Sequence, residues 1–185
     1  MAVFPAFLKL AGRKVLVVGG GPMAAAKIPP LVQAGAVIHL VSPAICAAVD
    51  ITAVASVEQR EFQPEDLDGA WLVVAAATPA VNREVAREAE RRHIFVNAVD
   101  DPPNASAYLG GVIRRSGVTI AVSTNGEAPA LAGVLREGID ALLPADLDRW
   151  TDCARRIRGQ WKANGVPIAE RRPQLVDALI GLYQR

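Results

Sequence analysis

The sequence predicts an α/β fold, in which a parallel sheet is followed by a small α+β region and then by a helical C-terminal region. Short apolar runs of strand length alternate with helical segments up to Asp100, which is typical of a parallel sheet with crossover helices. The run at residues 15–18 ends directly in Gly19-x-Gly21-x-x-Ala24, the spacing of a dinucleotide-binding turn. After Asp100, two strand-like runs flank a short turn and long helical patterns follow. The sheet is therefore expected to be Rossmann-like.

The elements of the sheet region follow from composition. Strands are expected at residues 15–18, 37–41, 71–76 and 94–96, where apolar and β-branched residues cluster. Helices are expected at residues 23–34 and 80–92, the second with charged residues along one face. Residues 60–62 are expected to add a short strand, with residues 64–67 as its exit.

One local conflict lies inside the first of these helices. Pro29-Pro30 interrupts it, and each interior proline removes an amide donor and crowds the preceding turn, at a cost of about 3 kcal/mol. We expect the helix either to kink at Ala25-Ala26 or to stop early and restart.

The second half of the chain predicts a different arrangement. Runs at residues 108–114 and 118–123 flank Arg114-Arg115-Ser116-Gly117, which favours an antiparallel hairpin. Residues 128–143 form a long helical pattern closed by Pro144, and two amphipathic helices separated by residues 164–167 complete the tail. The expected division is 1–112 for a dinucleotide-binding domain, 113–145 for a dimerisation region and 146–185 for a helical region.

Composition excludes several classes of protein. Of 185 residues, 51% are hydrophobic, which is ample for a core, and 20 basic residues nearly balance 19 acidic ones. Neither a nucleic-acid partner nor a membrane is therefore expected. The N-terminus has no signal-peptide pattern, and two isolated cysteines suit a reducing compartment, so a cytoplasmic location is expected. With only two histidines, far apart, no metal site is expected.

The glycine turn carries the first functional hypothesis. Gly19 would permit the tight turn, Gly21 would let a pyrophosphate approach the backbone, and the following helix end would receive the phosphate charge. A purely structural glycine turn remains the alternative. The strand at residues 37–41 ends without the acidic residue of an ordinary NAD site, so Ser42 is the candidate for a ribose hydroxyl. No arginine stands ready for a 2′-phosphate.

Asp100 carries the second hypothesis. It follows the apolar run at residues 93–99 and should lie at the carboxyl end of a strand, where open α/β sheets place their ligands. Asp-Asp-Pro-Pro is also good turn chemistry, so spacing alone leaves a catalytic and a turn aspartate equally favoured.

Several segments in order resemble one family. The relevant residues are Phe4-Pro5, Val18-Gly-Gly-Gly21, Lys27, Ala34-Gly-Ala36, Val41-Ser42-Pro43, Asn97-Ala-Val-Asp-Asp-Pro102, Ala121-Val-Ser123, Ala128-Pro-Ala-Leu-Ala132 and Leu135-Arg136-Glu137. The chain resembles the precorrin-2 dehydrogenase family, the N-terminal modules of siroheme synthases, some of which are also sirohydrochlorin ferrochelatases. The methyltransferase domain fused to some members has no counterpart here, so a stand-alone form is expected. Thr124-Asn125-Gly126, Ala107 and Gly110 depart from the usual pattern, near the expected tetrapyrrole site.

The resemblance implies NAD-dependent oxidation of precorrin-2 to sirohydrochlorin, with insertion of Fe²⁺ to give siroheme in members that are also ferrochelatases. It makes Asp100 the catalytic residue and Asp101 the turn residue. It implies a homodimer paired through residues 108–123 and 128–143. The implied cofactor-binding residues are Gly19, Gly21, Pro22, Met23, Ser42, Pro43, Ala44 and Thr78. The implied tetrapyrrole-binding residues are Ser106, Arg114, Ser123, Thr124 and Asn125.

Two other functions stay open from the sequence. A non-catalytic NAD-sensing regulatory module would share the glycine turn, the strand order and the neutral charge. The hairpin and helical tail favour the enzyme, since a sensor has no use for a tetrapyrrole site. A small-molecule reductase of another class is disfavoured because no Tyr-x-x-x-Lys pair occurs.

Overall fold

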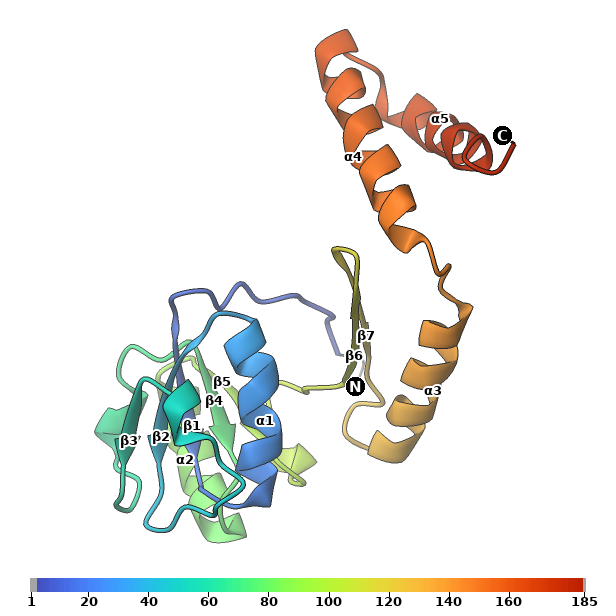
Figure 1. Cartoon of the computed structure of the whole chain (residues 1–185). Helices are drawn as coiled ribbons and strands as arrows, with labels where there is room; N and C mark the ends of the chain where they lie inside the picture. The colour runs from blue at the N-terminus through green and yellow to red at the C-terminus, as the bar shows by residue number, and fades with distance from the viewer. Residues whose placement is uncertain (1–2, 185) are drawn as a thin grey trace. The chain divides into compact units, whose positions relative to one another are not determined.

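The computed structural model describes residues 3–184 and separates into two compact units (Figure 1). Unit 1 comprises Met1–Leu109 with Asn125–Glu127, and unit 2 comprises Gly110–Thr124 with Ala128–Arg185.

Unit 1 is built on a five-stranded parallel sheet in the order β3-β2-β1-β4-β5. Its strands are β1 (Lys14–Val18), β2 (Val37–Val41), β3 (Ser56–Glu58), β4 (Leu72–Ala75) and β5 (Phe95–Ala98). Its helices are α1 (Pro22–Gln33) and α2 (Pro79–Arg91), with short 3₁₀ helices η1 (Ile51–Ala53), η2 (Pro64–Leu67) and η3 (Pro102–Asn104). The strand order reverses between β1 and β4, and ligands bind at that switch point in sheets of this kind. The predicted Rossmann-like sheet is confirmed.

Both faces of the sheet are covered, which explains why its central strands β1 and β4 are almost entirely apolar (Figure 1). Val15 and Val17 of β1 pack with Ile28 of α1 on one face. Leu16 of the same strand packs with Val85 of α2 on the other. The two apolar clusters hold the carboxyl ends of the strands in fixed register, and the candidate site lies on those ends.

The strand predicted at residues 60–62 is wrong. The third strand is β3, whose Ser56 pairs with His39 of β2. Beyond it the chain leaves the sheet, because Arg60 bonds Asp66 and Phe62 packs onto the core cluster beneath α2. A three-residue edge strand, largely exposed, has too weak a pattern to be found from sequence.

The proline pair does not divide the first helix. α1 is continuous through Pro29 and Pro30, so the predicted stop and restart is wrong. The two rings deprive the carbonyls of Ala25 and Ala26 of their amide partners. Both prolines lie on the exposed side of α1, where water can bond the freed carbonyls, while the buried Ile28 keeps the helix on the sheet.

Unit 2 begins with the predicted antiparallel hairpin, β6 (Gly111–Arg115) and β7 (Val118–Val122). Ser116 and Gly117 form its two-residue loop with φ of 49° and 79°, the conformation whose twist suits a hairpin. Helix α3 (Pro129–Leu142) packs on this hairpin, and α4 (Leu147–Asn164) and α5 (Ile168–Ile180) follow. Gly165 ends α4 in the left-handed conformation.

The first hairpin strand starts later than predicted. Ser106 and Ala107, just before it, donate their backbone amides to the carbonyl of Val96 in β5, at 2.9 and 2.8 Å.

Over residues 3–184, no helix has both the length and the apolar character needed to cross a membrane.

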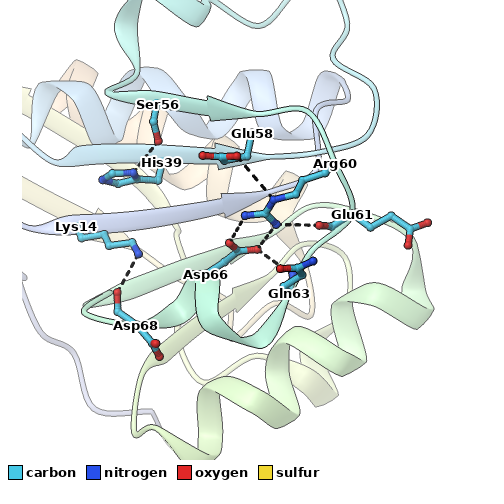
Figure 2. Close-up of polar contacts among 9 residues, drawn as sticks. All are labelled: Lys14, His39, Ser56, Glu58, Arg60, Glu61, Gln63, Asp66 and Asp68. Atoms are coloured by element: carbon cyan, nitrogen blue, oxygen red, sulfur yellow. Dashed lines mark hydrogen bonds and ion pairs between the residues drawn. The ribbon is translucent and has the colours of Figure 1, made fainter.

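An ion pair fastens the crossover between β3 and β4 (Figure 2). The guanidinium of Arg60 donates to both carboxylate oxygens of Asp66, at 2.6 and 2.9 Å, and the amide of Gln63 adds a third bond at 2.8 Å. Burial alone would raise the pKa of Asp66, but these bonds outweigh it and hold the pKa below its usual value. Figure 2 also shows His39, whose Nδ1 pairs with the hydroxyl of Ser56. Burial and the charge of the nearby Lys14 lower the pKa of His39.

We expect Asp66→Asn to lower the free energy of unfolding by no more than about 1 kcal/mol at neutral pH, because the ion pair that it breaks has a carboxylate 10% exposed but a guanidinium 37% exposed, which water screens. Because the pKa of Asp66 is lowered in the folded state, this contribution is complete above the unfolded pKa of about 3.9 and is lost as the pH falls from there through the lower folded-state pKa. Urea unfolding of the wild type and of Asp66→Asn, at several pH values from neutral to about 3, measures the two unfolding free energies. The difference between them should become smaller as the pH falls. Asp68→Asn, at a side chain 69% exposed, is the matched control. An unchanged unfolding free energy in Asp66→Asn would show that the pair contributes nothing.

Candidate functional site

The first two glycines of the turn after β1 are required by close packing. Gly19 has φ of +111°, and a Cβ there would collide with the carbonyl of Ala76 at the end of β4. A Cβ on Gly20 would collide with the carbonyl of Ala44 after β2. Sequence reasoning missed Gly20, although the run of three glycines was visible.

Gly21 is open where its neighbours are crowded. Its φ of −83° suits any residue, and no atom lies within 4 Å of the position a Cβ would take. It caps α1 without a side-chain bond, Pro22 follows it, and the first turn has no acidic residue. The amides of Met23 and Ala24 therefore point out of the N-terminus of α1, which is suited to bind an anion. The open space above Gly21 lets a pyrophosphate reach these amides. These residues fit the phosphates of a dinucleotide.

The loop after β2 is fastened to this turn. The amide of Gly19 donates to Val41 at 2.9 Å, and the amide of Cys46 donates to Gly20 at 2.8 Å. Ser42, predicted to bond a ribose hydroxyl, is 5% exposed, and its own hydroxyl donates to Ala44 at 2.7 Å. Its oxygen can still accept a bond, but its proton already stabilises the loop.

The segment after β4 completes the same edge of the sheet. Thr78 is the N-cap of α2, and its hydroxyl accepts a long bond from the amide of Val81 at 3.5 Å. The buried Asn82 accepts from the amide of Ala77 at 3.0 Å and so holds the segment in place. The structure thus gathers the predicted cofactor residues on three adjacent loops, namely Gly19, Gly21, Pro22, Met23, Ser42, Pro43, Ala44 and Thr78.

Asp100 and Asp101 have different surroundings after β5. Asp100 is exposed, has φ of +56°, and makes no side-chain hydrogen bond or ion pair within residues 3–184. Asp101 caps η3: its carboxylate accepts from Asn104 at 2.8 Å and its carbonyl accepts from the amide of Asn104 at 3.1 Å. Asp101 makes the turn contacts and Asp100 keeps a carboxylate available for chemistry. A non-glycine residue in the left-handed region costs energy, and such residues gather at functional sites.

Residues 106–107 run beside β5 and carry one predicted residue. Ser106 is exposed, and its hydroxyl oxygen accepts the amide of Val96 at 2.8 Å. Next to it Asn97 is 6% exposed and donates to the carbonyl of Ala107 at 2.9 Å. The side-chain oxygen of Asn97 has no partner within the described chain, so a buried acceptor is left over on β5, the strand that precedes Asp100. The sequence analysis did not name Asn97 as a site residue, although a polar side chain within an apolar strand was a visible signal.

The turn at Asn125 belongs to unit 1 and lies against the segment after Asp100. Asn125 and Gly126 both have positive φ, at 55° and 79°. A Cβ on Gly126 would approach the ring of Tyr108 at 3.0 Å and Pro102 at 3.2 Å. Three predicted tetrapyrrole-site residues, Asp100, Ser106 and Asn125, are thereby in one unit.

The other predicted tetrapyrrole-binding residues lie in unit 2. Arg114 is exposed on β6, opposite Thr119, and is without a side-chain partner in the described part of the chain. The guanidinium of the neighbouring Arg115 is already hydrogen-bonded within unit 2, because it donates to the carbonyls of Asp140 and Pro144 at the end of α3. Thr124 accepts the amide of Ala128 at 3.2 Å, while Ser123 is exposed. Residues 3–184 contain no cluster of three or more His, Cys, Asp or Glu that could hold a metal.

Comparison with known families places the sheet unit. Residues 6–111, more than half of the chain, match a family described as putative NAD(P)-binding. The chain belongs to this family. Residues 115–142 also match the family described as sirohaem biosynthesis protein central. The prediction of a nicotinamide dinucleotide cofactor agrees with both the family and the open glycine turn.

Curated relatives extend the similarity across both units. The siroheme synthase of Photorhabdus laumondii is 40% identical over 187 residues, covering 99% of this chain and 40% of the relative. Siroheme synthase 1 of Serratia proteamaculans is 41% identical over 176 residues, covering 93% and 37%. The chain thus spans about two fifths of the length of these relatives. The resemblance to siroheme-synthase modules stated from the sequence is confirmed.

Among solved structures, SirC, a precorrin-2 dehydrogenase, superposes with a TM-score of 0.71. The two chains are 24% identical, and the match covers 95% of this chain and 88% of the other. This likeness shows that the fold is shared. The alternative of a non-catalytic regulatory module has no support in these comparisons.

Proposed function

We propose that the chain is an NAD-dependent precorrin-2 dehydrogenase that oxidises precorrin-2 to sirohydrochlorin. The observation that carries the proposal is that one unit holds both an open glycine turn at the switch point and, two strands away, Asp100, whose carboxylate has no partner among residues 3–184. The siroheme synthases similar over nearly the whole chain support the choice of substrate.

The residues divide the work as follows. Amides at the start of α1 would bind the pyrophosphate of NAD above Gly21, and Pro43 and Ala44 would border its adenosine half. Bound NAD supplies the acceptor for a hydride leaving the macrocycle. Asp100 takes the accompanying proton as general base. Of the remaining predicted residues, Arg114 would pair with substrate carboxylates, and Ser106, Ser123, Thr124 and Asn125 would bond the macrocycle.

Metal insertion is a second activity that the same carboxylate can support. When Fe²⁺ enters sirohydrochlorin as a substrate, protons must leave the pyrrole nitrogens, and an unpaired carboxylate can accept them. The macrocycle itself supplies the ligands, so this activity needs no metal site in the protein. We also propose that the protein is located in the cytoplasm.

Turnover assays test the proposed function against the sensor alternative. We expect the purified chain to convert precorrin-2 to sirohydrochlorin repeatedly when NAD is supplied, and far more slowly with NADP. Absorbance of sirohydrochlorin and of NADH, recorded together, follows the reaction. Tight NAD binding with no conversion of precorrin-2 would favour the sensor.

Helix α3 supports the proposal of a homodimer. Its exposed apolar side chains are Leu131, Val134, Leu135 and Leu142, with exposed fractions from 44% to 85%. The two-stranded hairpin also leaves strand edges unpaired. A second copy that covers these surfaces would form a two-fold dimer.

We expect light scattering at micromolar protein to give the mass of a dimer, and Val134→Asp, at a side chain 66% exposed, to give a monomer. Burying a charge in the interface is the cause. Glu137→Lys, an equally exposed polar position on the same helix, is the control and should stay dimeric if it lies outside the contact. A wild-type monomer at all concentrations would contradict the dimer.

A further inference from the structure

The adenosine end of the candidate site lacks the usual acidic acceptor. β2 ends at Val41, and Ser42-Pro43-Ala44 follow it without an acid. Ser42 is buried and donates its proton to Ala44, so it offers a ribose hydroxyl only a neutral acceptor. A ribose at this edge would need another group to receive its hydroxyl proton.

The neighbouring strand supplies such a group. Glu58 is the last residue of β3, pairs in register with Val41, and accepts the amide of Ser42 on its carbonyl at 3.1 Å. Because parallel strands end at the same edge, its carboxylate lies at the edge where the loops of the glycine turn meet. The side chain is 55% exposed, so a ligand can reach it.

The charges around Glu58 leave its carboxylate largely uncommitted. Figure 2 shows it beside Arg60, whose Nε is 3.7 Å from one carboxylate oxygen, beyond hydrogen-bond distance. Arg60 gives its short bonds to Asp66 and to the carbonyl of Glu61. Two carboxylates against one guanidinium make the group net negative, so it accepts hydroxyls and repels a phosphate.

We propose that Glu58 receives the 2′-hydroxyl of the adenosine ribose and selects NAD over NADP. The carboxylate of the third strand thereby does what an acid at the end of the second strand does in an ordinary NAD site. Arg60, held by Asp66, is kept from offering its charge to a 2′-phosphate. This inference rests on the proposed NAD site at the glycine turn.

Calorimetric titration of the full chain with NAD, NADP and 2′-deoxy-NAD tests the proposal. We expect the wild type to bind NAD at least about 10-fold more tightly than the other two, the value of a charge-assisted hydrogen bond. Glu58→Ala should weaken NAD by about 10-fold or more and leave 2′-deoxy-NAD unchanged. Its affinities for NAD and NADP should then lie within a few-fold of each other, since the repulsion is gone.

Glu61→Gln removes a nearby exposed charge and should leave all three affinities as in the wild type. Equal melting temperatures show that the variants are folded. If Glu58→Ala keeps both the wild-type NAD affinity and the preference over NADP, the role of Glu58 is overturned while the NAD site stands. If the wild type binds no NAD, the proposed function itself fails, and the role of Glu58 with it.

Discussion

Asp100→Asn lowers the rate of precorrin-2 oxidation by roughly 10²–10⁴-fold, the usual contribution of a positioned acid–base group. NAD affinity and the melting temperature should not change. The side chain is exposed, packs into no core and bonds nothing in the described chain. Asparagine also tolerates the left-handed backbone at φ of +56°, whereas alanine there adds strain. The amide variant therefore removes the base and keeps the turn.

Asp101→Ala is the matched control. It loses the side-chain bond from Asn104 and keeps the backbone bond at the start of η3, so we expect a loss of about 1 kcal/mol in stability and little change in rate. Iron insertion should fall with Asp100→Asn, because one carboxylate serves both steps. Activity lost in Asp101→Ala and kept in Asp100→Asn would place the base one residue later. Full activity in both variants would mean that the proton passes to solvent and that Asp100 is no base.

Gly21→Asp abolishes NAD binding without unfolding the chain. Its backbone conformation is open to any residue and a Cβ there touches nothing, so folding has no reason to suffer. The carboxylate would occupy the open space above α1 and compete with the pyrophosphate for the same amides. Gly21→Ala, which adds bulk without charge, should weaken NAD by a smaller factor.

Calorimetry with NAD and thermal melting measure the two parts of this prediction. Gly159→Asp on α4, also an exposed position with no atom near a built Cβ, carries the same charge change elsewhere and should bind NAD normally. Gly19 and Gly20 cannot serve as test positions, because a side chain at either collides with backbone. A folded Gly21→Asp variant with wild-type NAD affinity would remove the cofactor from this loop.

Features repeated along several residues could be predicted from the sequence. The apolar strands, with both faces buried, and the glycine turn between β1 and α1 predicted the parallel sheet. Ser116-Gly117 between two strand-like runs predicted the hairpin. Asp100 could be placed at a strand end because apolar residues precede it and turn residues follow it.

Features decided by tertiary contacts could not be predicted from the sequence. The need for Gly20 arises from the backbone of Ala44, far along the chain, and the buried bond of Ser42 arises from the shape of its loop. Asn97 is visibly polar in the sequence of β5, but only the structure shows that its side-chain oxygen has no partner among residues 3–184. The proline pair survives inside α1 because both rings face outward, a fact about packing rather than propensity.

A single-turnover reaction tests the central claim most directly. The purified chain, as the only protein, is mixed anaerobically with precorrin-2 and NAD, and both products are followed by absorbance. We expect sirohydrochlorin and NADH to appear together in equal amounts, and neither to form with the Gly21→Asp variant. Precorrin-2 left unchanged by a chain that binds NAD normally would contradict it.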